Sequence, residues 1–344
     1  MKQDFQGGTR AGLVRSASLT NYVDVARKAG LDPGRMLREF RLPTRSLDDT
    51  EQVVPMDAVR ALLEASAERS GIEAFGLLMG ESRRMSNLGP LGLLLREQTT
   101  LREALQAMVA YGRRLNQALY LIVEEAGDVA VLREEIVLGR TGPVRQSTEL
   151  AICVAFRVLR QIMGPQWRPR RVCFAHDAPT DRSVHERVFG RNVEFGHDFN
   201  GIVCSRDDLD RTIPDADPAA ARLARRLLES ESPASAEDSM VAQVREIVLR
   251  QLGSGACSIE RVAQHLGIGR RTVHRRLASE HETFSSILDA VRCELADRYM
   301  KEGKRTMTEV STLLGFSALS GFSRWYRRRH GNTARRSRSG AQTG

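Results

Sequence analysis

The chain has 344 residues, and its 52 Lys and Arg against 43 Asp and Glu give a formal net charge of +9. Residues 251–344 alone hold 17 basic and 8 acidic residues, so the last quarter of the sequence accounts for the whole excess of positive charge. This distribution excludes a uniformly basic protein of the histone or ribosomal kind. It indicates a near-neutral body that carries a basic module for a polyanionic partner.

The composition is that of an ordinary globular protein, and the length favours two domains. No apolar run approaches the roughly 18 residues that a membrane span needs, and the N-terminus lacks the apolar stretch of a secretory signal. The five cysteines are odd in number and widely separated in the sequence, which predicts neither a disulfide framework nor a zinc site. We therefore expect a cytoplasmic protein with reduced thiols and without a metal, a cofactor or a membrane partner.

Residues 1–213 mix helical and strand patterns. Residues 1–17 are rich in small and polar residues and are expected to be disordered. Apolar spacings of three and four residues then predict helices at 56–70, 100–117 and 144–163. Runs of β-branched residues predict a hairpin at 119–125 and 129–137 and further strands at 172–176 and 201–204. Residues 18–213 are thus predicted to form an α+β domain.

The composition changes after this domain. Residues 214–238 are rich in Asp, Ala, Pro and Ser and are predicted to be an interdomain linker region. Residues 239–338 carry only helical patterns, and residues 339–344 are expected to be a disordered tail. The predicted fold is therefore multidomain, with an α+β domain followed by an all-α domain.

The all-α region contains an internal repeat. Residues 258–268 align with residues 306–316 at an offset of 48, which superimposes Gly267 on Gly315. The match continues at an offset of 49 into the residues that follow. Two copies are too few for a solenoid, and each has the form of a helix-turn-helix motif, at 258–279 and 306–329.

The first copy has suitable residues at the positions such a motif needs. Ser258 can cap the first helix, and Gly267 follows that helix where the chain requires a positive φ. The second helix would bury Val273 and Leu277, so its other face carries the donors Arg270, Arg271, Thr272, His274, Arg275 and Arg276. Such a face suits the DNA major groove, because arginine can bind guanine through two hydrogen bonds while neighbouring charges reach phosphates. A merely solvated basic face is the alternative, and the duplicated motif argues against it.

Residues 283–303, between the two copies, are predicted to form one amphipathic helix. Its roughly 18–20 residues would span about 27–30 Å. Successive major grooves on one face of a duplex lie about 34 Å apart. A rigid connector of this length would let two recognition helices of one chain enter adjacent major grooves of double-stranded DNA.

These features resemble the AraC/XylS family of bacterial transcription regulators over residues 240–335. The phrases that carry the resemblance are VAQHLG at 262–267, RTVHRRL at 271–277, TFSSILDAVR at 283–292, LGFS at 314–317 and FSRWY at 322–326. The resemblance places base-reading positions at Arg271, His274 and Arg275, and at Leu319, Ser320, Ser323 and Arg324. Phosphate contacts are expected from Arg270, Thr272, Arg276, Arg327 and Arg328.

Two residues depart from the family pattern in the first motif. Gly269 stands where the family usually has Ser, which predicts a weaker N-cap for the first recognition helix. His281 stands where the family usually has Gly, which predicts a strained corner after that helix.

The first domain resembles the effector-binding domain of one subgroup of that family, often described as arabinose-binding-like. The phrases lie within residues 18–212: FGLL at 75–78, LGPLG at 88–92, TTLREAL at 99–105, VEF at 193–195 and Asn200. The resemblance implies a small-molecule effector, which need not be a sugar, and leaves its binding residues unknown. RNA polymerase and a second copy of the chain are further candidate partners.

Enzymatic chemistry is disfavoured. His176 and His185 lack a third ligand at metal-binding spacing and are interpreted as structural or surface residues. Alternation in the strand at 129–137 turns only one of Glu134 and Glu135 inward, which argues against a shared catalytic pocket. We therefore predict a sequence-specific, effector-controlled transcription regulator and not an enzyme. The alternative is an architectural protein that binds DNA by charge without reading its sequence.

Overall fold

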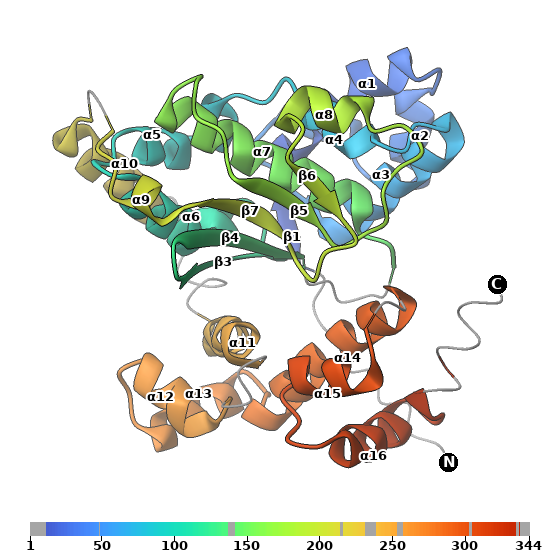
Figure 1. Ribbon diagram of the computed structural model, residues 1–344, viewed down its shortest axis with the longest axis vertical. Coiled ribbons are helices and arrows are strands. Elements are labelled where there is room, and N and C mark those ends of the chain that lie inside the picture. The colour runs from blue at the N-terminus through green and yellow to red at the C-terminus, as the bar shows by residue number, and fades with distance from the viewer. Residues whose placement is uncertain are drawn as a thin grey trace. The chain divides into compact units, whose positions relative to one another are not determined.

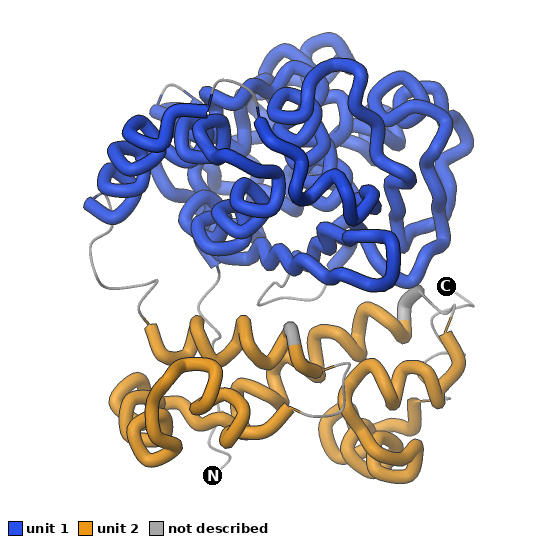
Figure 2. The backbone as a smooth tube through the Cα atoms, turned by 60° about the vertical axis from the view of Figure 1, so that its left-hand side comes forward, with its two compact units in different colours: residues 1–231 blue, residues 232–344 orange. Residues whose placement is uncertain are grey.

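The structure is a computed structural model, and it describes residues 12–47, 49–136, 142–213, 216–230, 239–252, 257–302, 305–334 and 337. The chain divides into two compact units, residues 1–231 and 232–344, shown in Figure 2. The first unit combines a sheet with helices and the second consists of helices, which confirms the predicted fold class.

A five-stranded sheet is the centre of the first unit. Its strand order is β3-β4-β7-β5-β6, and β5 and β6 form its parallel pair. β3 and β4 form the predicted hairpin, which turns at Gly127 with a φ of +61°. The strands are β3 (Leu119–Ala126), β4 (Val129–Ile136), β5 (Arg171–Phe174), β6 (Val193–Phe195) and β7 (Asn200–Ser205).

Helices cover one face of this sheet (Figure 1). Leu132 on β4 and Ile202 on β7 face the same hydrophobic cluster as Met108 on α6 and Phe156 on α7. The predicted helices α3, α6 and α7 are confirmed. The helices of this unit are α1 (Tyr22–Lys28), α2 (Pro33–Glu39), α3 (Met56–Ser70), α4 (Phe75–Gly80), α5 (Pro90–Arg96), α6 (Leu101–Leu115), α7 (Arg145–Met163), α8 (Ser183–Phe189) and α9 (Arg206–Leu209), with 3₁₀ turns η1 (Ser16–Leu19), η2 (Thr44–Leu47) and η3 (Met85–Leu88).

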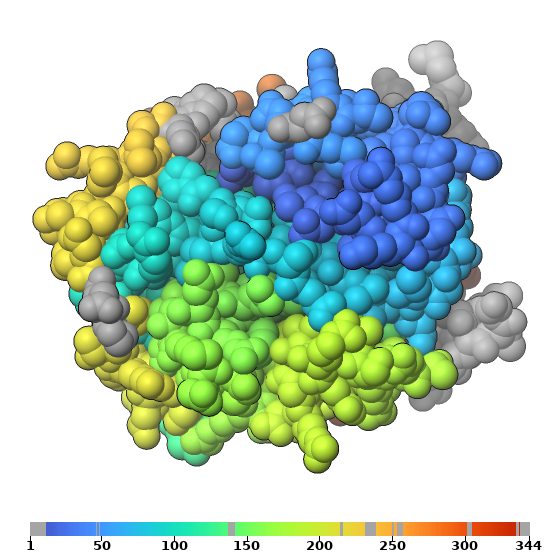
Figure 3. Space-filling view, turned by 90° about the horizontal axis from the view of Figure 1, so that it is seen from above, coloured from blue at the N-terminus to red at the C-terminus, as the bar shows by residue number. Residues whose placement is uncertain are grey.

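The N-terminal segment corrects one prediction. Residues 13–17 are ordered, because strand β1 (Leu13–Arg15) pairs antiparallel with β2 (Val53–Pro55) and buries Val14. Figure 3 shows the blue N-terminal part of this unit lying against its cyan part. The strand depends on a partner that lies far from it in the sequence, so local composition could not reveal it. Residues 1–11 lie outside the described residues.

The predicted linker region at 214–238 is also wrong over most of its described length. Residues 218–230 form helix α10 (Pro218–Ser230), which packs on α5. Ala224 and Leu228 are almost completely buried in the cluster that also covers the sheet. The first unit therefore continues through residue 230. The rest of the predicted linker, residues 231–238, and the predicted tail at 339–344 lie outside the described residues.

The second unit is helical throughout its described part. Its helices are α11 (Met240–Gln251), α12 (Ile259–His265), α13 (Arg270–Ser279), α14 (Phe284–Glu302), α15 (Met307–Leu313) and α16 (Leu319–His330). A separate hydrophobic cluster joins all six, with Val262, Val291 and Phe322 fully buried. Throughout the described part of the chain, no helix combines the length and the apolar character that a membrane crossing requires.

Candidate nucleic-acid interface

The first helix-turn-helix motif is held by the local contacts that its sequence predicts. Ser258 caps α12 by accepting a hydrogen bond from the backbone N–H of Arg261 at 3.3 Å. Gly267 ends that helix with a φ of +64°, and the N–H of Ile268 donates back to the carbonyl of Ala263. The chain then turns directly into α13. The motif predicted at 258–279 is therefore present.

The second motif repeats these contacts further along the chain. Thr306 occupies the position of Ser258 and forms a reciprocal capping box with Glu309, at 3.2 and 2.6 Å. Gly315 occupies the position of Gly267, with a φ of +70°. A β-carbon at Gly315 would also come within 2.7 Å of the Leu252 carbonyl oxygen, so packing as well as φ requires glycine. The predicted motif at 306–329 forms as α15 and α16.

Each recognition helix buries one face and exposes the other. Val273 and Leu277 fix α13 on the hydrophobic cluster, and Phe322 and Tyr326 fix α16. The opposite faces carry the predicted base-reading residues, and all of them are exposed: Arg271, His274 and Arg275 on α13, and Leu319, Ser320, Ser323 and Arg324 on α16. The structure thus brings each group together on the free face of one helix. It leaves their contacts with bases as a prediction.

The predicted phosphate-binding residues lie beside these faces. Arg276, Arg327 and Arg328 are exposed, and Thr272 is half-buried in the first turn of α13. Arg270 is exposed and pairs with Glu260 on α12 at 2.9 Å. An exposed pair of this kind contributes at most about 1 kcal/mol, so it could open in exchange for a phosphate. Basic side chains therefore surround each recognition face.

The two departures from the family pattern have the expected structural consequences. Gly269 precedes α13 without a side-chain hydrogen bond to the helix. His281 adopts a φ of +59° after α13, a conformation that favours glycine. Glu280, which precedes His281, stabilises neither of these positions. Its carboxylate instead accepts hydrogen bonds from the N–H groups of Met240 and Val241, at 2.7 and 3.2 Å. Glu280 thereby joins the end of α13 to the start of α11.

Helix α14 connects the two motifs. Its 19 residues span about 28 Å, in agreement with the predicted connector. Arg292 on this helix donates hydrogen bonds to the carbonyls of Leu314 and Gly315, at 2.9 and 3.2 Å. Its guanidinium also lies 4.2 Å from the ring centre of Phe316. Arg292 therefore clamps the turn of the second motif onto the connector, a role that the sequence did not reveal.

Replacing Arg292 with methionine should lower the free energy of unfolding of the second unit by about 2 kcal/mol. The change removes two charge-assisted hydrogen bonds and leaves half-buried carbonyls without donors. Urea unfolding followed through Trp325, in a Trp167→Phe background, measures the effect, since the sequence has two tryptophans. Arg276→Met is the matched control, because Arg276 is exposed and should change stability by less than about 0.5 kcal/mol. Equal effects of the two substitutions would contradict the clamp.

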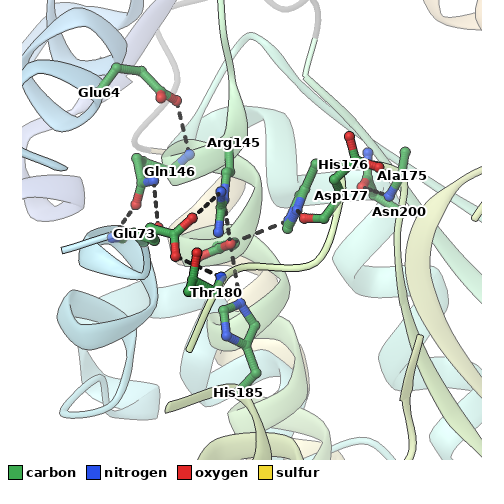
Figure 4. Close-up of polar contacts among 12 residues, drawn as sticks. Glu64, Glu73, Arg145, Gln146, Ala175, His176, Asp177, Thr180, His185 and Asn200 are labelled. Carbon is green, nitrogen blue, oxygen red and sulfur yellow. Dashed lines mark hydrogen bonds and ion pairs between the residues drawn. The ribbon is translucent and has the colours of Figure 1, made fainter. Parts of the chain in front are cut away.

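The first unit contains a buried polar cluster around Glu149 on α7. The carboxylate oxygen of Glu149 lies 3.0 Å from Arg145, 3.1 Å from His185 and 3.3 Å from His176. Figure 4 shows these three partners converging from α7, α8 and the segment after β5. Glu149 and His185 are completely buried, and burial is the main cause that lowers the pKa of His176. His185 thus joins α8 to α7 and His176 joins the segment after β5 to α7, in the structural role that the sequence favoured.

A different trio is close enough to hold a metal ion. Among the described residues, the ligand atoms of Cys173, Glu194 and His197 lie within 4.8 Å of one another. Burial raises the pKa of Cys173 to about 11, which keeps the thiol protonated near neutral pH. The Glu194 carboxylate lies 3.5 Å from Arg171, which already neutralises it. These charges do not favour a cation, and we assign no metal to the trio.

Comparison with known proteins agrees with this architecture. The family model of the N-terminal arabinose-binding domain of AraC transcription regulators matches residues 30–213. The family model of a helix-turn-helix domain matches residues 262–340. The HTH-type transcriptional regulator VirS of Mycobacterium tuberculosis is 30% identical over 333 residues, covering 95% of this chain and 96% of its own. The ornithine utilization regulator of Pseudomonas aeruginosa is 24% identical over 321 residues, covering 92% of this chain and 94% of its own.

A solved structure is also similar. The crystal structure of the transcriptional regulator CdpR from Pseudomonas aeruginosa shares 23% identity and covers 89% of this chain and 96% of its own, with a TM-score of 0.44. Two helix-turn-helix motifs that follow an α+β domain in the sequence define a DNA-binding transcription regulator. The extent of the matches places it further: this chain belongs to the family of AraC transcription regulators with an N-terminal arabinose-binding-like domain.

Proposed function

We propose that the protein binds a specific DNA sequence and that a small-molecule effector bound to the first unit controls this binding. The observation that supports sequence-specific DNA binding is the exposed face of α13, where Arg271, His274 and Arg275 lie together. Within the described part of the chain, no hydrogen bond or ion pair occupies the side chains of Arg271 and Arg275. Their donors are therefore available to base edges in a major groove.

The second recognition helix would contribute less discrimination. Its exposed face offers Ser320 and Ser323, which can bond to several bases, and Arg324, which can bind guanine. Leu319 is 41% exposed at the start of α16, where an apolar side chain suits a thymine methyl group. The connector α14 has a length that suits two adjacent major grooves of one duplex. The phosphate contacts would come from Arg270, Thr272, Arg276, Arg327 and Arg328.

The arabinose-binding-like character of the first unit supports control by an effector. An effector that binds one conformation of the protein better than another shifts the population toward the favoured conformation. This shift changes the occupancy of a promoter if the two conformations differ in DNA affinity. The name of the ornithine utilization regulator associates one relative of full length with a small metabolite. RNA polymerase and a second copy of this chain are the further partners in this proposal. On α10, Leu223 and Leu227 lie one turn apart and are 56% and 41% exposed, an apolar strip that suits a homodimer.

Replacing Arg275 with alanine should weaken binding to the specific duplex by about 1–3 kcal/mol and relax specificity at one base pair. The reason is the loss of a donor pair that a base edge requires. Arg276→Ala is the matched control, because a phosphate contact should weaken specific and random duplexes alike and reduce the salt dependence. The duplex is first selected from a random library, and dissociation constants are then measured over a salt series.

The same measurements test the alternative of an architectural protein. Such a protein would bind the selected and random duplexes with a ratio near one, and Arg275→Ala would weaken both equally. That result would overturn the proposed sequence-specific regulator.

A further inference from the structure

An apolar pocket lies inside the first unit, between the helical layer and the sheet. Its cavity volume is about 150 Å³. Aliphatic side chains from α3, α5, α6 and α7 form most of its wall, among them Val59, Leu91, Met108 and Val154. Small residues on α6 and α7, including Gly112 and Ala151, leave this space open. A pocket of this kind is the usual form of a small-molecule site.

Glu134 is the acidic residue in this largely apolar wall. It lies on β4 opposite Leu121 of β3, on the sheet face that the helices cover, and it is 1% exposed. Both of its carboxyl oxygens are buried, and neither has a hydrogen-bond partner among the described residues. Its neighbour Glu135 points to the other face of the sheet and lies 3.6 Å from Arg133. Only one of the two acids thus faces the pocket, as alternation predicts, although both are buried.

A carboxyl group in this position is costly to the folded protein. A buried polar group without a hydrogen bond costs roughly 1–3 kcal/mol, and a charged one costs more. Accordingly, burial raises the pKa of Glu134 well above its usual value. Ser147 on α7 adds a second buried polar group to the wall, since its hydroxyl also lacks a partner among the described residues. Unpaired polar groups on a cavity wall mark where the polar end of a ligand would sit.

The terminal nitrogens of two arginines on the pocket wall are engaged, whereas the buried Nε atoms of Arg15 and Arg83 have no partner among the described residues and Arg84 is exposed. Arg83 donates hydrogen bonds to the carbonyls of Ala17 and Ser18, and Arg15 pairs with Glu51. No ion pair joins Arg83 to Glu134 in the described part of the chain. The wall thus contains unpaired donors as well as acceptors, and the two unpaired oxygens of Glu134 are the groups that a donating ligand would satisfy.

We propose that this pocket is the effector site and that its ligand is a primary amine on a small apolar body, which takes the proton of Glu134 so that the resulting ammonium group pairs with the carboxylate. This inference rests on the proposed function, since it identifies the site and ligand class of that effector. A cavity of about 150 Å³ accepts a molecule of the size of benzene. Benzylamine is therefore a suitable probe, because it joins one aromatic ring to one amine.

Calorimetric titration of the full chain tests the ligand class. Benzylamine should bind the wild type and Glu135→Gln with similar affinity, and it should bind Glu134→Gln at least about tenfold more weakly, a loss of about 1.4 kcal/mol. Toluene, which lacks the amine, should bind more weakly than benzylamine and show no such difference between variants. Ala151→Leu, which fills the cavity, should abolish binding of both. Glu134→Gln keeps the shape of the side chain, and its thermal unfolding verifies the fold.

Three results would overturn the inference: no binding of benzylamine at millimolar concentration, equal binding to wild type and Glu134→Gln, or tighter binding of benzoate. DNA binding by the same chain separates this failure from failure of the proposed function. If benzylamine fails but the selected duplex is bound specifically, sequence-specific regulation stands and the pocket assignment falls. If benzylamine binds through Glu134 without changing DNA affinity, the ligand site stands and its role as the effector site falls.

Discussion

Gly76→Ala should lower the free energy of unfolding of the first unit by about 3 kcal/mol or more. A β-carbon at Gly76 would lie 2.0 Å from the backbone carbonyl oxygen of Gln146, so α4 and α7 would have to move apart. Their separation would also break the hydrogen bond from the N–H of Gly76 to the side chain of Gln146, which is 2.8 Å long and buried. Urea unfolding followed through Trp167, in a Trp325→Phe background, measures this effect.

Gly34→Ala is the matched control for this prediction. Gly34 lies in α2 of the same unit, and a β-carbon there would approach only the ends of two side chains, at 3.4 Å, which is an ordinary van der Waals distance. Alanine within a helix should be neutral or stabilise the unit by up to about 1 kcal/mol. A loss of less than about 1 kcal/mol from Gly76→Ala would show that the two helices can separate without cost.

The two helix-turn-helix motifs and the connector of the second unit could be predicted from the sequence. Its helix ends depend on neighbours in the chain: Ser258 and Thr306 each bond to an N–H three positions further on, and Gly267 and Gly315 each end a helix. The exposed faces of α13 and α16 then follow from helical periodicity. Arg292 escaped prediction because its partners, the carbonyls of Leu314 and Gly315, come from another part of the unit.

The first unit was less predictable, because its decisive contacts join distant parts of the chain. Strand β1 exists through its pairing with β2, and α10 is buried through its contact with α5. The pocket is a stronger case. Alternation along β4 predicts that one of Glu134 and Glu135 faces inward, but whether Glu134 finds a partner there depends on the several other elements that line the pocket. Alternation therefore predicted that one of the two acids faces inward, but neither which one it is nor whether it has a partner there.

Glu149→Leu should lower the free energy of unfolding of the first unit by about 3–5 kcal/mol. The carboxylate is completely buried and contacts Arg145, His176 and His185, so its removal leaves three groups without their common acceptor. Urea unfolding near neutral pH measures this loss. Combining Glu149→Leu with His185→Phe should cost less than the sum of the two single changes, because the pair is then replaced by apolar groups. Additive losses would contradict a shared cluster.

The same cluster should make stability depend on pH through His176. Burial lowers the pKa of His176 in the folded protein below its unfolded value of about 6.5, so the unfolded chain binds the proton first as the pH falls. Stability is therefore present above about pH 6.5 and is lost progressively below it. In Glu149→Leu this acid-induced loss should be larger, because the Glu149 charge opposes the shift caused by burial. Urea midpoints between about pH 8 and pH 5 measure both effects, with His176→Gln as the control that should remove this component. An unchanged pH profile in His176→Gln would assign the acid sensitivity to other groups, whereas a flattened one would trace it to the helix junction around Glu149.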